Sequence, residues 1–278
     1  MLIEQIRETG ILFDVVEEAV VTASGTVIPG KKAIVNCETG EPISVVGDKY
    51  KVATMNEVFT AMDEQLQSST LDLTGMTVDV HTSHKGARAM IDVVLPAHEI
   101  DLGGDITKMR ITSLNSYDGS WKYTSRAGGI RIACLNGQVL GNIFAKYSSR
   151  HNGSMNIAAG AEHISTLLQT FNEAKDYWSK MMKSKVNIVD VNGVFALFLD
   201  GTPTIKDQEK FEKRTSVKKL TESYEDYVLE HGKTVWSLYN ALTDFVTHKE
   251  YNAGTKAAMK NFYEDRLIVA ASSRVFTR

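Results

Sequence analysis

The fold of this chain is decided by a stretch that reads TVDVHTSHKGARAMIDVVL from residue 77 to residue 95 and TKMRITSLNSYDGSWKYTSRAGGIRIAC from residue 107 to residue 134. In both pieces apolar side chains recur at every second position, which is the spacing of half-buried β-strands. Turn residues separate the runs at positions 84–86, 117–120 and 127–129. The pattern predicts an antiparallel sheet of at least four strands with one face packed on helices.

The residues before this stretch predict strands followed by one helix. Runs rich in β-branched residues at 11–21, 32–36 and 43–52 are typical of strands. Thr54 and Glu57 then have the spacing of a capping box, and apolar residues follow at helical intervals as far as Leu66.

The residues after it predict a helical second half. An amphipathic segment runs from 155 to about 185, residues 187–199 form a short apolar interlude with a turn at Asn192-Gly193, and helices follow around 216–230, 233–248 and 255–272. The predicted fold is α+β: a twisted antiparallel sheet covered by helices, with a helical C-terminal region. Residues 1–150 form the β-rich part with one early helix, and residues 151–278 pack on it in one integrated domain.

The composition is that of an ordinary globular protein. The chain has 278 residues, of which 43% are hydrophobic and 23% charged, and this excludes a mainly disordered or fibrous state. No apolar run approaches the roughly 18 residues that span a bilayer, so we expect no membrane partner. Cys37 and Cys134 are too few for a disulfide scaffold, which predicts a cytoplasmic location. Cys134 lies at one of the alternate positions that carry apolar side chains in its predicted strand, which predicts a buried structural thiol.

The charge is unevenly distributed along the chain. The net charge of −3 divides into −8 for residues 1–100 and +5 for residues 101–278. Between residues 106 and 150, seven basic residues meet a single acid, Asp118. A local excess of this kind indicates an anionic partner more strongly than the total charge opposes one, although a solvated sheet face remains the alternative.

Strand alternation places several of these basic residues together on the face opposite the apolar one, if the register is right. Like charges side by side repel unless something anionic neutralises them. Phosphates do so, and aromatic rings offer stacking surfaces to unpaired bases. Trp121 and Tyr123 have the parity of the core, whereas Tyr117 lies at a turn and Tyr147 lies between two cations. The predicted nucleic-acid-binding residues are Lys108, Arg110, Tyr117, Lys122, Arg126, Arg131, Lys146, Tyr147 and Arg150.

Motifs of catalysis are mostly absent from the sequence. It has no phosphate-binding P-loop, no GxGxxG after a strand, no GxSxG and no HExxH. Asp79, His81 and His84 come nearest to a metal site, but a complete ligand set cannot be assembled. We therefore predict no catalytic residue, no metal and no cofactor. An enzyme acting on nucleic acid, with Asp92 added to these three residues, remains an alternative.

Several short motifs resemble those of one family. They are IPGKKA (28–33), ETG (38–40), VVGDKYKV (45–52), NEVF (56–59), YDGS (117–120), Arg131 followed by CLNG (134–137), and NALTDFVTH (240–248). In order and spacing they resemble the "phage/plasmid-like protein" family, a domain of unknown function common on bacteriophages and conjugative plasmids, over about residues 13–248. The resemblance implies an accessory protein of mobile elements without agreed catalytic residues. Its layout of sheet followed by helices is similar to that of phage single-strand annealing proteins.

Two hypotheses for function follow. In the first, the chain is a phage- or plasmid-encoded DNA-binding protein that prefers single strands and acts stoichiometrically in replication or recombination. In the second, it is a protein-interaction module that binds and modifies a host replication, transcription or defence complex. Apolar C-terminal helices also make a homo-oligomer plausible on either hypothesis.

Overall fold

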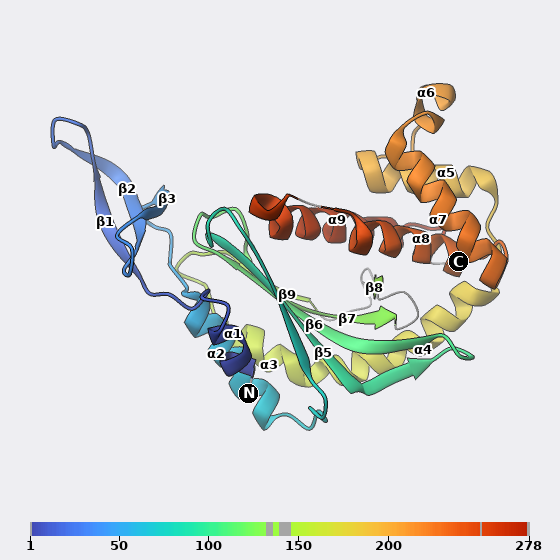
Figure 1. The fold of residues 1–278 in the computed structure, drawn as a ribbon, viewed down its shortest axis with the longest axis horizontal. Helices are drawn as coiled ribbons and strands as arrows, with labels where there is room; N and C mark the ends of the chain where they lie inside the picture. The colour runs from blue at the N-terminus through green and yellow to red at the C-terminus, as the bar shows by residue number, and fades with distance from the viewer. Residues whose placement is uncertain (1, 132–135, 139–145, 251, 277–278) are drawn as a thin grey trace.

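The computed structural model describes residues 2–131, 136–138, 146–250 and 252–276, and its centre is a large antiparallel sheet (Figure 1). The strand order is β4-β5-β6-β7-β8, and β9 also pairs with β7. Every pairing in this sheet is antiparallel, as the alternating sequence predicts. The strands are β4 (Thr77–Ser83), β5 (Arg88–Asp101), β6 (Ile106–Ser116), β7 (Tyr123–Arg131), β8 (Asn136–Gln138) and β9 (Lys146–Ser149).

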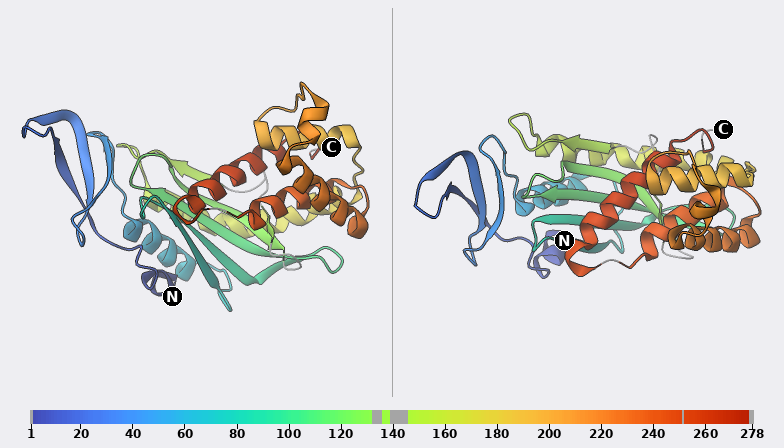
Figure 2. Two further views of the ribbon diagram at one scale, coloured as in Figure 1. Left: turned by 45° about the horizontal axis from the view of Figure 1, so that its top comes forward. Right: turned by 90° about the horizontal axis from the view of Figure 1, so that it is seen from above.

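Helices cover both faces of the large sheet, so the fold is α+β as predicted (Figure 2). On one face lie α2 (Met55–Ser68), α3 (Ile157–Glu162), the 3-10 helix η1 (His163–Thr166) and α4 (Leu167–Lys183). On the other face α9 (Lys256–Ala271) crosses over β4 and β5. The other helices are α1 (Leu2–Arg7), α5 (Ile188–Asp200), α6 (Gln208–Glu212), α7 (Thr215–His231), α8 (Val235–His248) and the 3-10 helix η2 (Ala253–Thr255).

The main core lies between the sheet and the helices α2 and α4. Ile91 and Val93 of β5 and Met109 and Ile111 of β6 are fully buried in it. These residues have the parity that the sequence assigns to the apolar face, so the predicted register of β5 and β6 is confirmed.

A second, smaller sheet projects from the rest of the molecule (Figure 1). It consists of β1 (Val15–Val21), β2 (Val27–Asn36) and β3 (Pro42–Gly47), in that order. Ile34 and Val46 on one of its faces are buried in the main core. Several other valines and isoleucines of this sheet are exposed: Val16, Val21, Val27, Ile28 and Val45.

The predicted capping box at the start of α2 is confirmed. The hydroxyl of Thr54 accepts a hydrogen bond from the backbone N–H of Glu57 at 3.0 Å, and the Glu57 carboxylate accepts one from the backbone N–H of Thr54 at 2.8 Å. These bonds satisfy two donors that an unprotected helix end leaves unpaired.

The prediction of a turn at Asn192-Gly193 is wrong, because both residues lie inside α5. Asn187 caps this helix by accepting a hydrogen bond from the N–H of Asp190 at 2.9 Å, and Gly201 ends it with a φ of +79°. Apolar side chains lie on several sides of the helix, so the interval of 3.6 residues that marks an amphipathic helix is missing. The three later helices agree with the predicted ranges.

The predicted turn at residues 127–129 is also wrong, because β7 continues through it. Gly128 pairs with Arg110 and Gly129 with Met109, without a register shift. Glycine inside a strand often marks a close approach of another part of the chain instead of a turn. Arg126 and Arg131 are therefore an odd number of positions apart in one regular strand, and their positions belong to opposite faces.

Within the described residues, none of the helices has both the length and the apolar character needed to cross a lipid bilayer.

Candidate functional site

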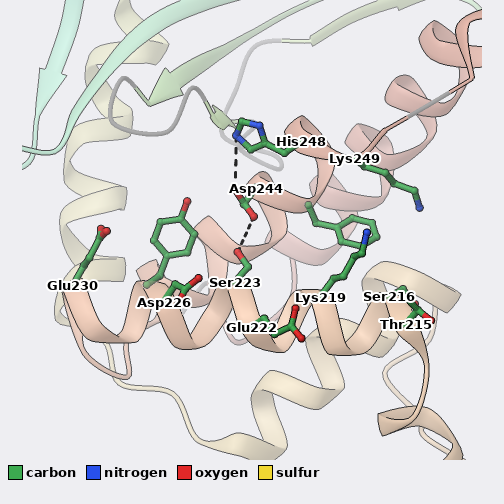
Figure 3. A pocket seen from close by; sticks show the side chains of 12 residues that line it. Thr215, Ser216, Lys219, Glu222, Ser223, Asp226, Glu230, Asp244, His248 and Lys249 are labelled. Atoms are coloured by element: carbon green, nitrogen blue, oxygen red, sulfur yellow. Dashed lines mark hydrogen bonds and ion pairs between the residues drawn. The ribbon is translucent and has the colours of Figure 1, made fainter.

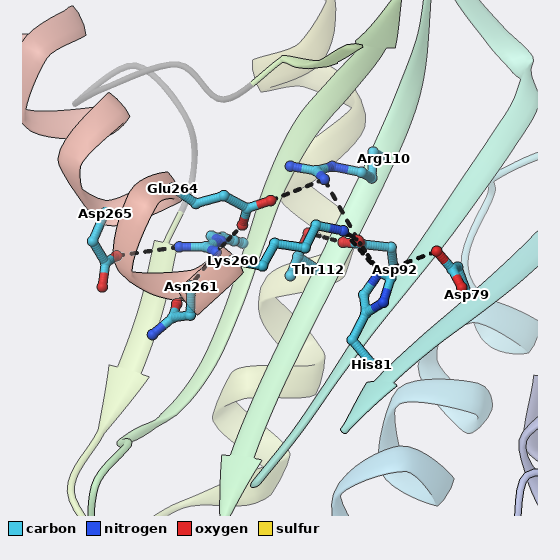
Figure 4. Close-up of polar contacts among 10 residues, drawn as sticks. Asp79, His81, Asp92, Arg110, Thr112, Lys260, Asn261, Glu264 and Asp265 are labelled. Carbon is cyan, nitrogen blue, oxygen red and sulfur yellow. Dashed lines mark hydrogen bonds and ion pairs between the residues drawn. The ribbon is translucent and has the colours of Figure 1, made fainter. Parts of the chain in front are cut away.

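The face of the sheet that carries the predicted basic residues is covered by α9 (Figure 4). Arg110 and Arg126 are only 4% and 3% exposed, and Glu264 of α9 is 1% exposed. Arg110 Nη1 donates to Glu264 Oε1 at 3.1 Å, and Arg126 Nη2 donates to Glu264 Oε2. Arg126 Nη1 also donates to Asp265 at 3.3 Å. One carboxylate thus pairs with two neighbouring guanidinium groups, and Asp265 supplies a second negative charge for Arg126.

Asp92 of β5 is the second buried carboxylate of this cluster. It accepts hydrogen bonds from the Thr112 hydroxyl at 2.6 Å and from Lys260 Nζ of α9 at 2.5 Å, and Arg110 Nη1 lies 3.5 Å away. Burial by itself would raise the pKa of Asp92, but Arg110 and Lys260 hold that pKa well below its usual range. Asp92 is therefore charged at neutral pH.

The pKa of Glu264 is subject to the same two opposing effects. Burial alone would raise its pKa, and the charges of Arg110 and Arg126 lower the pKa below its ordinary value. We call the group Asp92, Arg110, Arg126, Lys260 and Glu264 the buried charge cluster. Its three cations and two carboxylates pair with one another across the interface between the sheet and α9.

The prediction of an open basic face is therefore wrong for Arg110 and Arg126. The sequence argument that adjacent arginines need an anion is sound, but the chain supplies that anion itself from α9. Lys260 and Glu264 are four residues apart in a predicted helix, which in sequence reads as an ordinary exposed ion pair. No feature of the sequence indicates which face of the sheet that helix covers.

His81 and Asp79 lie at the edge of the buried charge cluster, on β4. His81 Nε2 lies 3.0 Å from Asp79, 3.5 Å from Asp92 and 2.8 Å from Lys260 Nζ. Burial would lower the pKa of His81, but its hydrogen bonds to the two carboxylates raise it. His84 is exposed in the β4–β5 turn. Among the described residues, no three side chains of His, Cys, Asp or Glu gather to form a metal site.

Tyr117 does not offer a stacking surface, contrary to the prediction. It is fully buried, and its hydroxyl accepts a hydrogen bond from the backbone N–H of Met55 at 2.9 Å. Its ring lies 5.7 Å from that of Phe13, and burial raises its pKa to about 12. Tyr117 directly follows the end of β6, and its ring faces the core.

Tyr147 is partly buried and also packs inwards. Its ring lies 5.8 Å from that of Tyr123, and its hydroxyl donates to the carbonyl of Asn156 at 2.8 Å. Tyr123 is buried, as its parity predicts. Trp121, which has the same predicted parity, is instead partly exposed and packs on the opposite side, against Leu114. It precedes the start of β7, where strand alternation does not apply.

Three other predicted residues are located by their strand positions. Lys108 is partly buried on β6. Arg131 pairs through its backbone with Thr107, at a strand position that does not share the face of Arg126. Lys146 pairs through its backbone with Arg126. The predicted thiol of Cys134 lies outside the described residues.

Two of the predicted residues, Lys122 and Arg150, are exposed and lie side by side. They directly flank Tyr123 and Ser149, which form the last residue pair between β7 and β9. Lys51 lies in a loop that is hydrogen-bonded to the residue after Arg150, and Lys49 is two positions earlier in the same loop. We call Lys49, Lys51, Lys122 and Arg150 the basic end of the sheet.

Hydrogen bonds and ring stacking join the segments of the basic end. The backbone N–H of Lys51 donates to the carbonyl of His151 at 3.1 Å. The rings of Tyr50 and His151 stack with centroids 4.8 Å apart, and the Tyr50 hydroxyl donates to the carbonyl of Ser116 at 2.7 Å. Within the described part of the chain, none of the four cations has an ion-pair partner. Sequence reasoning missed Lys49 and Lys51 because they lie outside the basic stretch at 106–150.

A pocket of about 250 Å³ adjoins the basic end, between the sheet and α9. Trp121 and Lys122 lie on one side of it, and Asn261 and Asp265 of α9 lie on another. Arg126 of the buried charge cluster also lines it. The pocket is polar, and it brings a partly exposed aromatic ring next to an unpaired cation.

A larger groove of about 670 Å³ lies between α7 and α8 (Figure 3). In it Ser223 Oγ donates to Asp244 at 2.9 Å, and His248 Nε2 lies 3.8 Å from the other oxygen of Asp244. The carboxylate lies between the hydroxyl and the imidazole, whereas nucleophilic catalysis needs the imidazole in contact with the hydroxyl. This arrangement is not a catalytic triad.

Comparison with family models matches residues 42–267 to the family described as Domain of unknown function (DUF932). The chain belongs to this family. The match begins later and extends further than the motifs that suggested a domain of unknown function. No curated protein and no solved structure matches the chain.

The family match includes the buried charge cluster, the basic end, the adjoining pocket and the α7–α8 groove. The strands β1 and β2 lie before its start. These two strands carry most of the exposed apolar residues of the small sheet.

Proposed function

We propose that this member of the family is a phage- or plasmid-encoded DNA-binding protein that prefers single strands, and that it acts stoichiometrically in replication or recombination in the host cytoplasm. The observation that carries the proposal is the basic end. Its four cations come from the loop after β3, the start of β7 and the end of β9.

The electrostatics of the basic end support an anionic strand as its ligand. Cations that have intramolecular partners, such as Arg110 and Arg126, gain little from a phosphate because their charge is already neutralised. Unpaired and exposed cations release condensed counterions from DNA when they bind phosphates, which supplies affinity without sequence specificity. The binding surface therefore differs from the one that the sequence predicted: it lies at the end of the sheet instead of across its face.

Salt-dependent binding tests this proposal. Four phosphate contacts on a single strand correspond to a slope of about −2.8 in a plot of log K against log salt concentration. The double variant Lys122→Ala/Arg150→Ala should halve that slope and weaken binding at low salt. A matched control, Lys175→Ala/Lys218→Ala, removes two exposed lysines of α4 and α7 and should bind like the wild type.

Fluorescently labelled oligonucleotides, single-stranded and duplex, provide the measurement at two or more salt concentrations. Stronger binding of the single strand is expected, because unpaired bases can contact the aromatic residue beside Lys122. Absence of binding at low salt, or an affinity that salt does not change, would refute the proposal.

A second candidate function, a protein-interaction module, is favoured by the exposed apolar residues of the small sheet. Val21 and Val27 pair across the β1–β2 hairpin and are both more than half exposed, at 53% and 58%. A host protein that stays bound stoichiometrically after nuclease treatment, and is lost with Val21→Asp/Val27→Asp, would support this function. Retention of the same protein by the variant would contradict it.

A further inference from the structure

The pocket beside the basic end has the size of a small ligand. Its volume of about 250 Å³ is below the roughly 300–1,000 Å³ typical of sites for drug-sized molecules and cofactors. A single nucleobase is smaller than those ligands. The pocket walls are Leu114, Ser120, Trp121, Lys122, Thr124, Arg126, Ser148, Asn261 and Asp265.

Trp121 supplies a surface on which a base can stack. It packs against Met90, Leu114 and Ala257, so the ring is held in place, but it is not fully buried. Its indole N–H has no hydrogen-bond acceptor among the described residues. Stacking on an aromatic ring tolerates every base because each base has a π-face.

The α9 side of the pocket offers a hydrogen-bond donor next to an acceptor. Asn261 Oδ1 accepts from Arg126 Nη2 at 3.5 Å, which leaves the two N–H groups of the Asn261 amide for another acceptor. Asp265, one helical turn further on, is half-exposed and is held by Arg126 at 3.3 Å. Each of the four bases presents an adjacent donor and acceptor on its pairing edge, so this pair can serve any unpaired base.

Arg126 gives the pocket a fixed wall. It is 3% exposed and is anchored by Glu264, yet its Nε has no hydrogen-bond partner among the described residues.

The phosphates on either side of such a base would meet the basic end. Lys122 lines the pocket itself, and Ser148, another of its walls, is two residues before Arg150. A base in the pocket therefore leaves its backbone beside the two adjacent cations Lys122 and Arg150.

We propose that this pocket holds one unpaired base of a bound single strand, stacked on Trp121 and hydrogen-bonded to Asn261 and Asp265. The inference rests on the proposed DNA-binding function and identifies its ligand as a strand with at least one unstacked base. A duplex cannot satisfy the site unless a base leaves its stack, which costs free energy.

Intrinsic fluorescence tests the pocket directly. The chain has three tryptophans, and Trp178 and Trp236 are fully buried. Quenching by an added oligonucleotide therefore reports on Trp121. The probe is a labelled oligothymidylate, so that binding by anisotropy and quenching of tryptophan are measured in the same titration, beside a strand of equal length with abasic sites.

We expect saturable quenching with the wild type, and weaker binding of the abasic strand. Trp121→Phe should bind oligothymidylate nearly as well but without quenching, and Trp121→Ala should bind roughly 5- to 150-fold more weakly. Trp121→Phe keeps an aromatic ring among Met90, Leu114 and Ala257, so it controls for loss of folding.

The outcomes separate this inference from the proposed function. Salt-dependent binding without quenching, or with equal affinity for the abasic strand, overturns the base pocket and leaves DNA binding intact. Absence of any binding at low salt overturns both. Weaker binding by Trp121→Ala together with unchanged preference for the normal strand over the abasic one also contradicts the pocket.

Discussion

Replacing Glu264 with Gln removes the charge that holds two arginines at the interface between the sheet and α9. The change keeps the shape of the side chain, so its effect on folding is electrostatic. Arg110 and Arg126 each lose a charged acceptor while they stay buried, at 4% and 3% exposure. Removing one partner from a buried ion pair typically costs about 3–5 kcal/mol, because a charge is left without compensation.

The structure places this variant at the lower end of that range. Arg110 keeps Asp92 at 3.5 Å, and Arg126 keeps Asp265 at 3.3 Å, so neither guanidinium is entirely unpaired. We therefore expect Glu264→Gln to lower the free energy of unfolding by about 3 kcal/mol. At about 2 °C or more per kcal/mol for a chain of this size, the melting temperature should fall by about 6 °C or more.

Urea unfolding followed by circular dichroism gives the change in free energy. The matched control is Asp265→Asn, which removes the exposed partner of the same Arg126 and should cost less than about 1 kcal/mol. If Glu264→Gln unfolds within about 0.5 kcal/mol of the wild type, or no earlier than Asp265→Asn, the reasoning about the buried charge cluster is wrong.

The pH dependence of the difference provides a separate check. The folded-state pKa values of Asp92 and Glu264 are depressed from 3.8 and 4.5, so their contribution to stability is complete above those values. This contribution to stability is lost as the pH falls below 3.8 and 4.5 towards the folded-state pKa values. The difference between wild type and Glu264→Gln should therefore be constant near neutral pH and shrink below about pH 4.5.

Three further predictions concern other parts of the chain. The pKa of His81 is raised above 6.5, and an NMR titration should measure a pKa above that value. The contribution of His81 to stability should be lost as the pH rises through this pKa. A measured pKa below 6.5 would contradict the contacts with Asp79. Thr54→Ala should cost about 1 kcal/mol in urea unfolding by removing the cap of α2, whereas Thr54→Ser should cost less. Gly160→Ala should cost about 1–3 kcal/mol, because a Cβ there would lie 2.4 Å from the Tyr123 ring; a neutral effect would show that α3 shifts freely.

Local sequence patterns predicted much of the fold. Alternation identified β5 and β6 and assigned Ile91 and Ile111 to the core, because a half-buried strand needs an apolar side chain at every second position. The capping residues Thr54 and Glu57 marked the start of α2 for an equally local reason. Patterns without a clear period failed: α5 is apolar on several sides, and the glycines of β7 resemble a turn.

The candidate site was predictable only in part. Lys122 and Arg150 were found because they lie in the basic stretch, whereas the loop with Lys51 reaches the neighbour of Arg150 through a hydrogen bond between segments that are distant in sequence. Arg110 and Arg126 were assigned to the solvent face because nothing in the sequence shows which helix covers a sheet.

The sequence by itself determined that the chain forms a sheet with one apolar face, that its second half is helical, and that positive charges gather on the middle strands. These properties depend on neighbours a few positions apart. Only the tertiary structure decided which charges remain free to bind a partner. Glu264 follows Arg126 by more than a hundred residues, yet it neutralises Arg126 because α9 packs across the sheet. A buried charge needs a partner wherever the fold can supply one, whereas Lys122 and Arg150 remain exposed at the end of the sheet.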